Sequence, residues 1–113
     1  MLQARDERGR LVGKPKPGVL SEMVANLGRS NAFVIVERVD EDSDGDWYVQ
    51  VWLRDDNTYQ LEFRDGMAAE HYQTRTISQE KVIDALSGWA DGRPGWKDTF
   101  MWNNIGSWFE NAD

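Results

Sequence analysis

The chain has 113 residues, of which 40% are hydrophobic and 29% charged, and these values suit one folded globular domain. It contains no cysteine, which excludes disulfides, thiolate metal sites and cysteine nucleophiles. No apolar run approaches the ~18 residues that span a bilayer, and the first residues lack the apolar core of a signal peptide. We therefore expect a soluble cytoplasmic protein without membrane contact.

Charge is spread unevenly along the chain, whose formal net charge at pH 7 is −7. Residues 1–17 carry a net charge of +3, and the remaining residues carry −10. An acidic globule is repelled by phosphate backbones, so nucleic acid is not an expected partner. A basic protein would instead be attracted to it.

The first half of the chain predicts an arm, a helix and strands. Residues 1–17 show no sustained periodicity and end in alternating lysines and prolines, which predicts a flexible basic arm. Residues 18–113 are then expected to form a single α+β domain. Apolar residues at helical spacing between Val19 and Leu27, followed by Gly28, predict a short helix. Four strand-like stretches follow, at about residues 32–39, 47–54, 58–64 and 71–77.

The second and third of these strands alternate clearly between apolar and polar residues. Their apolar positions are Trp47, Val49, Val51, Leu53, Tyr59, Leu61 and Phe63. Because side chains alternate with period two, these positions must lie on the same side of a paired hairpin. A three-residue loop at residues 55–57 achieves this by pairing Leu53 with Tyr59. Asn57 suits the left-handed position that such a loop requires.

The C-terminal part of the chain predicts two helices. Ser78 is a candidate N-cap, and Ile77 and Val82 are spaced as a hydrophobic staple. This helix is expected to end near Gly92, and a shorter one is expected from Pro94 to about Trp102. The tryptophans predicted to point inward are Trp47, Trp89, Trp96 and Trp102.

The predicted order is thus one helix, four strands and two helices, joined by short connections. Short connections favour an antiparallel arrangement of neighbouring strands. We predict an α+β fold in which a four-stranded antiparallel meander sheet carries the N-terminal helix and the two C-terminal helices on one face.

The opposite face of the predicted sheet combines aromatic, amide and charged side chains, as protein-interaction hot spots do. The hairpin register pairs Trp52 with Gln60 across this face. The candidate partner-binding residues are Tyr48, Gln50, Trp52, Gln60, Glu62, Arg64 and His71. The fourth strand presents to this face either His71, Gln73 and Arg75 or, in the other orientation, Tyr72, Thr74 and Thr76.

These features favour a non-enzymatic binding protein that engages a protein partner through the sheet face, and the acidic body favours a basic partner. One alternative is a small-ligand-binding module or hydrolase that uses a pocket near His71, with Glu62 at its mouth. Another is a homodimer formed through the same face, so that monomer and homodimer both stay open.

The sequence predicts no cofactor and no metal. Residues 40–46 have the D-x-D-x-D-G spacing of a calcium loop, but Val51 stands where the bidentate glutamate is needed. We favour an acidic hairpin loop there, with calcium binding as the alternative. His71 is the only histidine, so a zinc site would need at least three carboxylates. Three carboxylates between residues 62 and 70 could supply an acid and a base, although 20 acidic residues make such neighbours common.

Several short motifs lie in the predicted strands and in the segment that follows them. They are Gln50-Val51-Trp52, the run from Tyr59 to Gly66, His71-Tyr72-Gln73, Gly88-Trp89-Ala90, Trp96 and Trp102. In these motifs the chain resembles, over about residues 32–102, a family of small, acidic, uncharacterised bacterial proteins, which implies a shared fold. In layout and charge it is also similar to immunity proteins of bacterial toxin systems, which implies a basic toxin or nuclease as partner.

Overall fold

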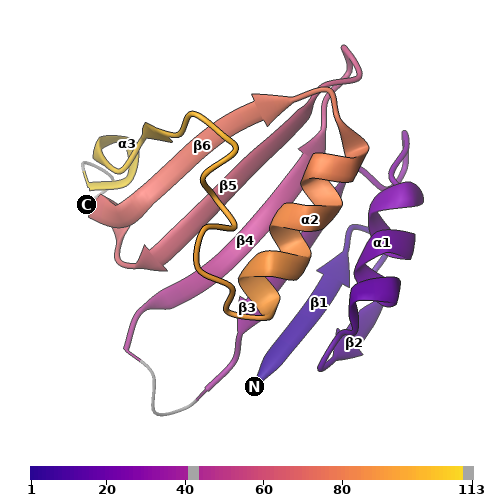
Figure 1. Ribbon diagram of the computed structural model, residues 1–113, viewed down its shortest axis with the longest axis horizontal. Coiled ribbons are helices and arrows are strands. Elements are labelled where there is room, and N and C mark those ends of the chain that lie inside the picture. Colours follow the sequence, from indigo (N-terminus) through magenta and orange to yellow (C-terminus); the bar gives the residue numbers. More distant parts are fainter. Residues whose placement is uncertain (41–43, 111–113) are drawn as a thin grey trace.

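The computed structural model describes residues 1–40 and 44–110, which form an antiparallel sheet with two helices on one face (Figure 1). The strands, in the spatial order β2-β1-β3-β4-β5-β6-β7, are β1 (Leu2–Asp6), β2 (Leu11–Gly13), β3 (Phe33–Arg38), β4 (Asp46–Leu53), β5 (Tyr59–Gly66), β6 (His71–Thr76) and β7 (Asn103–Asn104). The helices are α1 (Pro17–Ala25), α2 (Gln79–Ala90), α3 (Ser107–Glu110) and the 3-10 turn η1 (Ala68–Glu70). The predicted α+β class and antiparallel sheet are confirmed.

The four predicted strands correspond to β3, β4, β5 and β6, and the predicted hairpin register is confirmed. Leu53 pairs with Tyr59 across β4 and β5. The loop closes with a hydrogen bond of 2.8 Å from the Arg54 backbone N–H to the Thr58 carbonyl. Asn57 adopts the left-handed conformation, with φ of 67°. The local alternation of apolar residues was therefore sufficient to set this register.

The N-terminal residues correct the prediction, because the sheet has seven strands within the described residues rather than four. Instead of a flexible arm at residues 1–17, the structure has the hairpin of β1 and β2, and β1 pairs with β3 from Leu2 to Asp6. Ala4 is fully buried in the core. The Asp6 carboxylate accepts the Arg10 backbone N–H at 3.0 Å and so stabilises the turn. Strands this short are stabilised by pairing with the sheet, which composition alone does not reveal.

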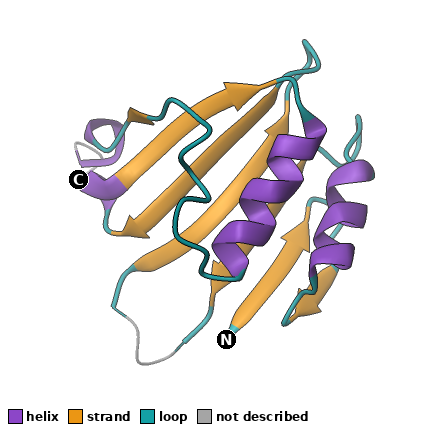
Figure 2. Cartoon of the chain, in the orientation of Figure 1, coloured by secondary structure: helices purple, strands orange, loops and turns teal. Residues whose placement is uncertain are grey.

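Helices α1 and α2 pack side by side on one face of the sheet and bury the core (Figure 2). Ser78 caps α2 as predicted, since its hydroxyl accepts the Lys81 backbone N–H at 3.2 Å. The predicted staple does not form, because Ile77 is 83% exposed. The core consists of Ala4, Leu20, Met23, Val24, Val34, Val36, Val49, Val51, Leu61, Phe63, Val82, Ala85, Leu86 and Trp89.

The segment after α2 contains turns where a helix was predicted from Pro94 to about Trp102. Gly95 has φ of +85°, which a helix does not accommodate. The segment still buries aromatic rings, because the Phe63 ring lies 5.1 Å from Trp96 and 4.7 Å from Trp102. It thereby covers part of the sheet beside α2 (Figure 1). Trp47, also predicted to point inward, is 36% exposed near the start of β4.

The edges of the sheet are short. Strand β2 has three residues and β7 has two, so little unpaired backbone is offered to another strand. Association of this protein through sheet edges is therefore disfavoured. Across residues 1–40 and 44–110, every helix is too short or too polar to cross a membrane.

Candidate functional site

The candidate site is the sheet face opposite α1 and α2, called here the outer face. All seven predicted partner-binding residues lie on it, because the register aligns them across three strands. Its cross-strand rows are Tyr48-Arg64-His71, Gln50-Glu62-Gln73 and Trp52-Gln60-Arg75. The orientation of the fourth strand is thereby decided, since Tyr72 pairs with the core residue Phe63 and faces the helices.

At one end of the outer face, His71 is the centre of a hydrogen-bonded group. Its Nε2 lies 2.9 Å from Glu62 Oε1, and its Nδ1 accepts the Nε–H of Arg64 at 3.0 Å. Because an arginine Nε–H can only donate, Nδ1 must be unprotonated, and Nε2 then carries the proton that Glu62 accepts. The Tyr48 hydroxyl lies 3.4 Å from the same Nδ1.

Helix α3 closes over this group. The Phe109 ring lies 4.4 Å from the His71 ring, and the Arg64 guanidinium lies over Phe109 at 4.8 Å from the ring centroid. His71 is consequently only 1% exposed, and Glu62 only 8%. We call Tyr48, Glu62, Arg64, His71 and Phe109 the His71 cluster.

The electrostatics of the cluster favour an ionised glutamate. Burial alone would raise the pKa of Glu62, but hydrogen bonds from His71, Gln60 and Gln50 outweigh it and hold that pKa below its ordinary value. One of these bonds, from the Gln60 amide to Glu62 Oε2, measures 2.9 Å. Burial raises the pKa of Tyr48, and the positive charge of Arg64 opposes this increase only in part. The cluster therefore joins an anionic Glu62 to a cationic Arg64 through the His71 imidazole.

This geometry assigns His71 a positioning role. Both of its ring nitrogens are engaged within the protein, and the ring is covered, so neither nitrogen is presented to a substrate or a metal. His71 and Glu62 lie beneath the surface and hold Arg64 and Tyr48, which are partly exposed. The arrangement does not favour the alternative of a hydrolase or ligand pocket built around His71.

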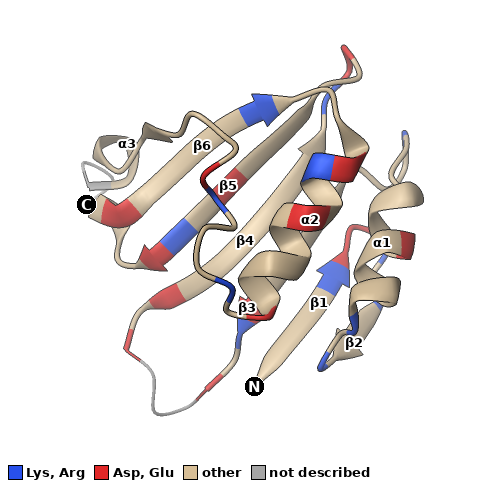
Figure 3. Ribbon diagram, viewed as in Figure 1, with Lys and Arg blue, Asp and Glu red and all other residues tan. Residues whose placement is uncertain are grey.

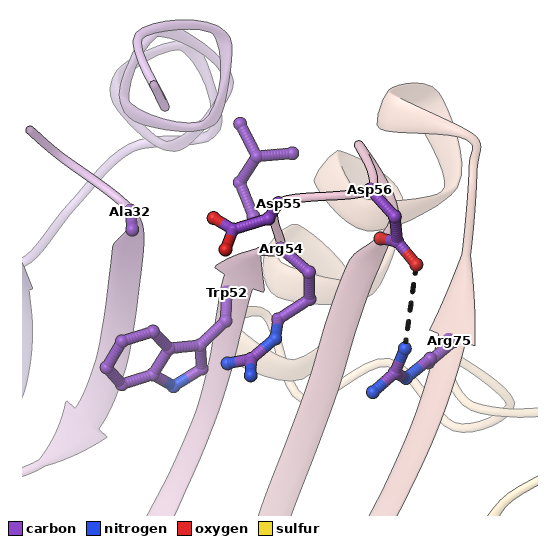
Figure 4. Close-up of a pocket in the computed structure, with 7 residues that line it drawn as sticks. Ala32, Trp52, Arg54, Asp55, Asp56 and Arg75 are labelled. Atoms are coloured by element: carbon purple, nitrogen blue, oxygen red, sulfur yellow. Dashed lines mark ion pairs between the residues drawn. The ribbon is translucent and has the colours of Figure 1, made fainter. Parts of the chain in front are cut away.

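The other end of the outer face is open. The Trp52 ring packs against Phe33, with ring centroids 4.8 Å apart. Beside it lies a shallow pocket of about 440 Å³ between Trp52 and Arg75, with Arg54 and the β4–β5 loop between them (Figure 4). Arg75 forms an ion pair of 4.0 Å with Asp56, drawn as a dashed line in Figure 4.

Arg54 differs from the other arginines of this face. Its side chain is exposed and makes no hydrogen bond or ion pair with the described residues. In Figure 4 its guanidinium lies between the Trp52 indole and Arg75. Hydrogen bonds from Thr58 to Asp56 lower the pKa of that carboxyl group, so the loop beside Arg54 stays anionic at neutral pH.

Three residues of the outer face were not identified from the sequence: Phe33, Arg54 and Phe109. Phe33 belongs to a strand that is apolar on both faces, so alternation could not assign its side. Arg54 follows Trp52 by two residues, and strand parity offered a signal for it. Phe109 lies 38 residues after His71, and although its apolar surroundings predict that this segment folds back onto the domain, they do not reveal which residue it contacts.

The metal and calcium predictions have different outcomes. Within residues 1–40 and 44–110, no group of three or more His, Asp or Glu side chains is arranged to hold a metal ion. The predicted calcium alternative at residues 40–46 falls partly outside the described residues.

Comparison of the chain with protein-family models, curated proteins and solved structures finds no match. The function must therefore be inferred from the residues and geometry of the outer face.

Proposed function

We propose that this protein binds a basic protein partner through the outer face, with Trp52 as the main anchor. The observation that carries the proposal is the open end of this face, where an aromatic pair lies beside an arginine that has no side-chain partner among the described residues. Tryptophan and arginine are enriched in interface hot spots, because one supplies apolar area and the other adaptable hydrogen bonds.

The His71 cluster supports this role by fixing the far end of the same face. Arg64 is held by His71 and Phe109 and lies 3.8 Å from Asp46 in an ion pair. Its side chain is 15% exposed, so it presents a small, oriented part of its surface. Side chains that are already ordered lose less entropy on binding, which improves affinity.

Charge favours a basic partner. The chain has a net charge of −7, which accelerates encounter with a positively charged protein. The arginines of the outer face do not oppose this attraction strongly, since three of them are paired with carboxylates. These pairs are Arg5–Glu37 at 3.2 Å, Arg64–Asp46 at 3.8 Å and Arg75–Asp56 at 4.0 Å. The similarity in layout and charge to immunity proteins favours the same kind of partner.

The test compares two tryptophan variants that change opposite faces of the sheet. Tagged wild type, Trp52→Ala and Trp47→Ala are used to capture partners from the lysate of the source cell. A captured protein is then purified, and its affinity for each variant is measured by titration calorimetry. We expect Trp52→Ala to weaken binding by about 30-fold, as loss of a hot-spot residue does, and Trp47→Ala to bind as the wild type does.

Two outcomes would contradict the proposal. Wild-type affinity in Trp52→Ala, with unchanged thermal unfolding, would place the interface elsewhere. Sedimentation of the wild type at two concentrations tests the homodimer alternative directly. A dimer that Trp52→Ala abolishes would assign the outer face to self-association instead of to a different protein.

A further inference from the structure

A second site lies on the helix side of the sheet, at the C-terminal end of α2. Three tryptophans, Trp47, Trp89 and Trp96, line a cleft of about 330 Å³ there, which we call the tryptophan pocket. They come from β4, α2 and the turn segment after α2. The outer face lies on the other side of the sheet, so this site is separate from the proposed partner interface.

The aromatic walls are fixed in place by close backbone contacts. The Trp47 indole donates from Nε1 to the Asp44 carbonyl at 3.0 Å. Its ring lies so close to Gly66 that a Cβ there would approach within 2.8 Å. Trp96 lies equally close to Gly88, where an added Cβ would come within 2.7 Å of the Trp96 Cβ. The pocket is therefore largely formed before any ligand arrives, as small-molecule sites are.

The cations at the pocket have aromatic partners instead of acidic ones. Arg38 lies over Trp89 at 5.5 Å from the ring centroid, and Lys97 lies over Phe63 at 5.5 Å. Neither side chain makes an ion pair within 4.0 Å with the described residues, whereas Arg93 pairs with Asp91 at 3.3 Å. Figure 3 shows basic positions at the end of β3 and in the segment after α2, with acidic positions beside them. Among the described residues, these two cations therefore have no carboxylate within ion-pair distance.

One carboxylate, Asp65, also lines the pocket. Burial raises the pKa of Asp65, the charge of Lys97 lowers it, and Glu70 raises it further. Among the residues that line the pocket, Arg38 and Lys97 outnumber this carboxylate, and Arg93 is paired with Asp91. An anionic group placed beside Arg38 would gain charge-assisted hydrogen bonds, which are the stronger class.

We propose that the tryptophan pocket binds a small organic anion that carries a planar ring. The ring would stack on the partly exposed indoles of Trp47 and Trp96, and the anionic group would pair with Arg38 and Lys97. The volume of about 330 Å³ is at the small end of ligand pockets, which suits a single compact molecule rather than a polymer. A nucleoside monophosphate and an aromatic carboxylate share this chemistry.

The test titrates three probes into the folded wild-type protein by calorimetry, with backbone amide NMR shifts to locate the site. The probes are adenosine monophosphate, 2-naphthoate and inorganic phosphate, each raised to about 10 mM. We expect saturable binding of at least one ring-bearing anion, at least about tenfold tighter than inorganic phosphate. Preference for the nucleotide assigns a phosphate ligand, and preference for naphthoate assigns a carboxylate ligand.

Variants connect the binding to the pocket. Arg38→Gln should weaken the ring-bearing anion by about tenfold, whereas Trp52→Ala on the outer face should leave its affinity unchanged. Lys97→Gln is the second variant, should Arg38→Gln fail to fold. The proposal would be overturned if neither ring-bearing probe showed saturable binding. It would also be overturned if the folded Arg38→Gln and Lys97→Gln variants bound the ring-bearing anion with the affinity of the wild type. Neither result bears on the partner interface.

Discussion

The two ends of the outer face are built from the same strands and differ in what covers them. At one end, α3 covers the His71 cluster, and the polar atoms there bond to one another. At the other end, Trp52 lies beside an arginine that has no partner among the described residues. The comparison shows that residues on one sheet face, with the same alternation, can be buried in a hydrogen-bonded cluster or left open to solvent.

The largest effect is expected from removing the imidazole of the His71 cluster. His71→Ala removes the hydrogen bonds that the imidazole makes with Glu62 and Arg64, so the free energy of unfolding should fall by about 3 kcal/mol. Chemical denaturation measures this change. Gln73→Ala, on the same strand and face, is the control, with an expected change within about 0.5 kcal/mol. Similar losses in both variants would mean that the hydrogen bonds of the cluster contribute little.

The two arginines of the outer face sharpen the comparison further. Arg64→Gln removes a buried hydrogen bond to His71 and should reduce unfolding free energy by about 2 kcal/mol. Arg54→Gln should leave stability within about 0.5 kcal/mol, because the Arg54 side chain is exposed. Thermal unfolding of the two variants side by side provides the measurement. A larger loss for Arg54→Gln than for Arg64→Gln would reverse the assignment of the two ends.

The cover supplied by α3 is expected to have a smaller effect. Phe109→Ala removes the ring that lies on His71 and Arg64, at a cost of about 1 kcal/mol. It should also speed exchange of the His71 imidazole proton, which NMR detects. Trp108→Ala is the matched control, since Trp108 is 66% exposed on the same helix. Slow proton exchange that persists in Phe109→Ala would show that α3 does not seal the cluster.

Acid should weaken the cluster gradually. Because the folded state holds the pKa of Glu62 below 4.5, Glu62 stabilises the protein above that pH, and the contribution is lost as pH falls through the lowered pKa. Asp65 acts in the opposite direction, since its pKa is raised and its ionised form is disfavoured in the fold. The acid side of the stability profile should therefore be flatter in Glu62→Gln and steeper in Asp65→Asn. Unfolding measured between pH 3 and pH 6 decides this, and unchanged profiles would refute it.

The sequence determined the central part of the fold by local patterns. Alternation in β4 and β5 set the hairpin register, Asn57 closed the loop, and Ser78 began α2. The same alternation placed Trp52 and Gln60 on one face, because period-two geometry depends only on neighbouring residues.

Only the tertiary structure decided the contacts that join distant parts of the chain. Strand β1 gains its stability from β3, about 30 residues later, and Phe109 covers a histidine from a different element. The tryptophan pocket likewise unites β4, α2 and the turn segment. Burial and desolvation act between residues that are close in space, and spacing along the chain does not encode which residues those are.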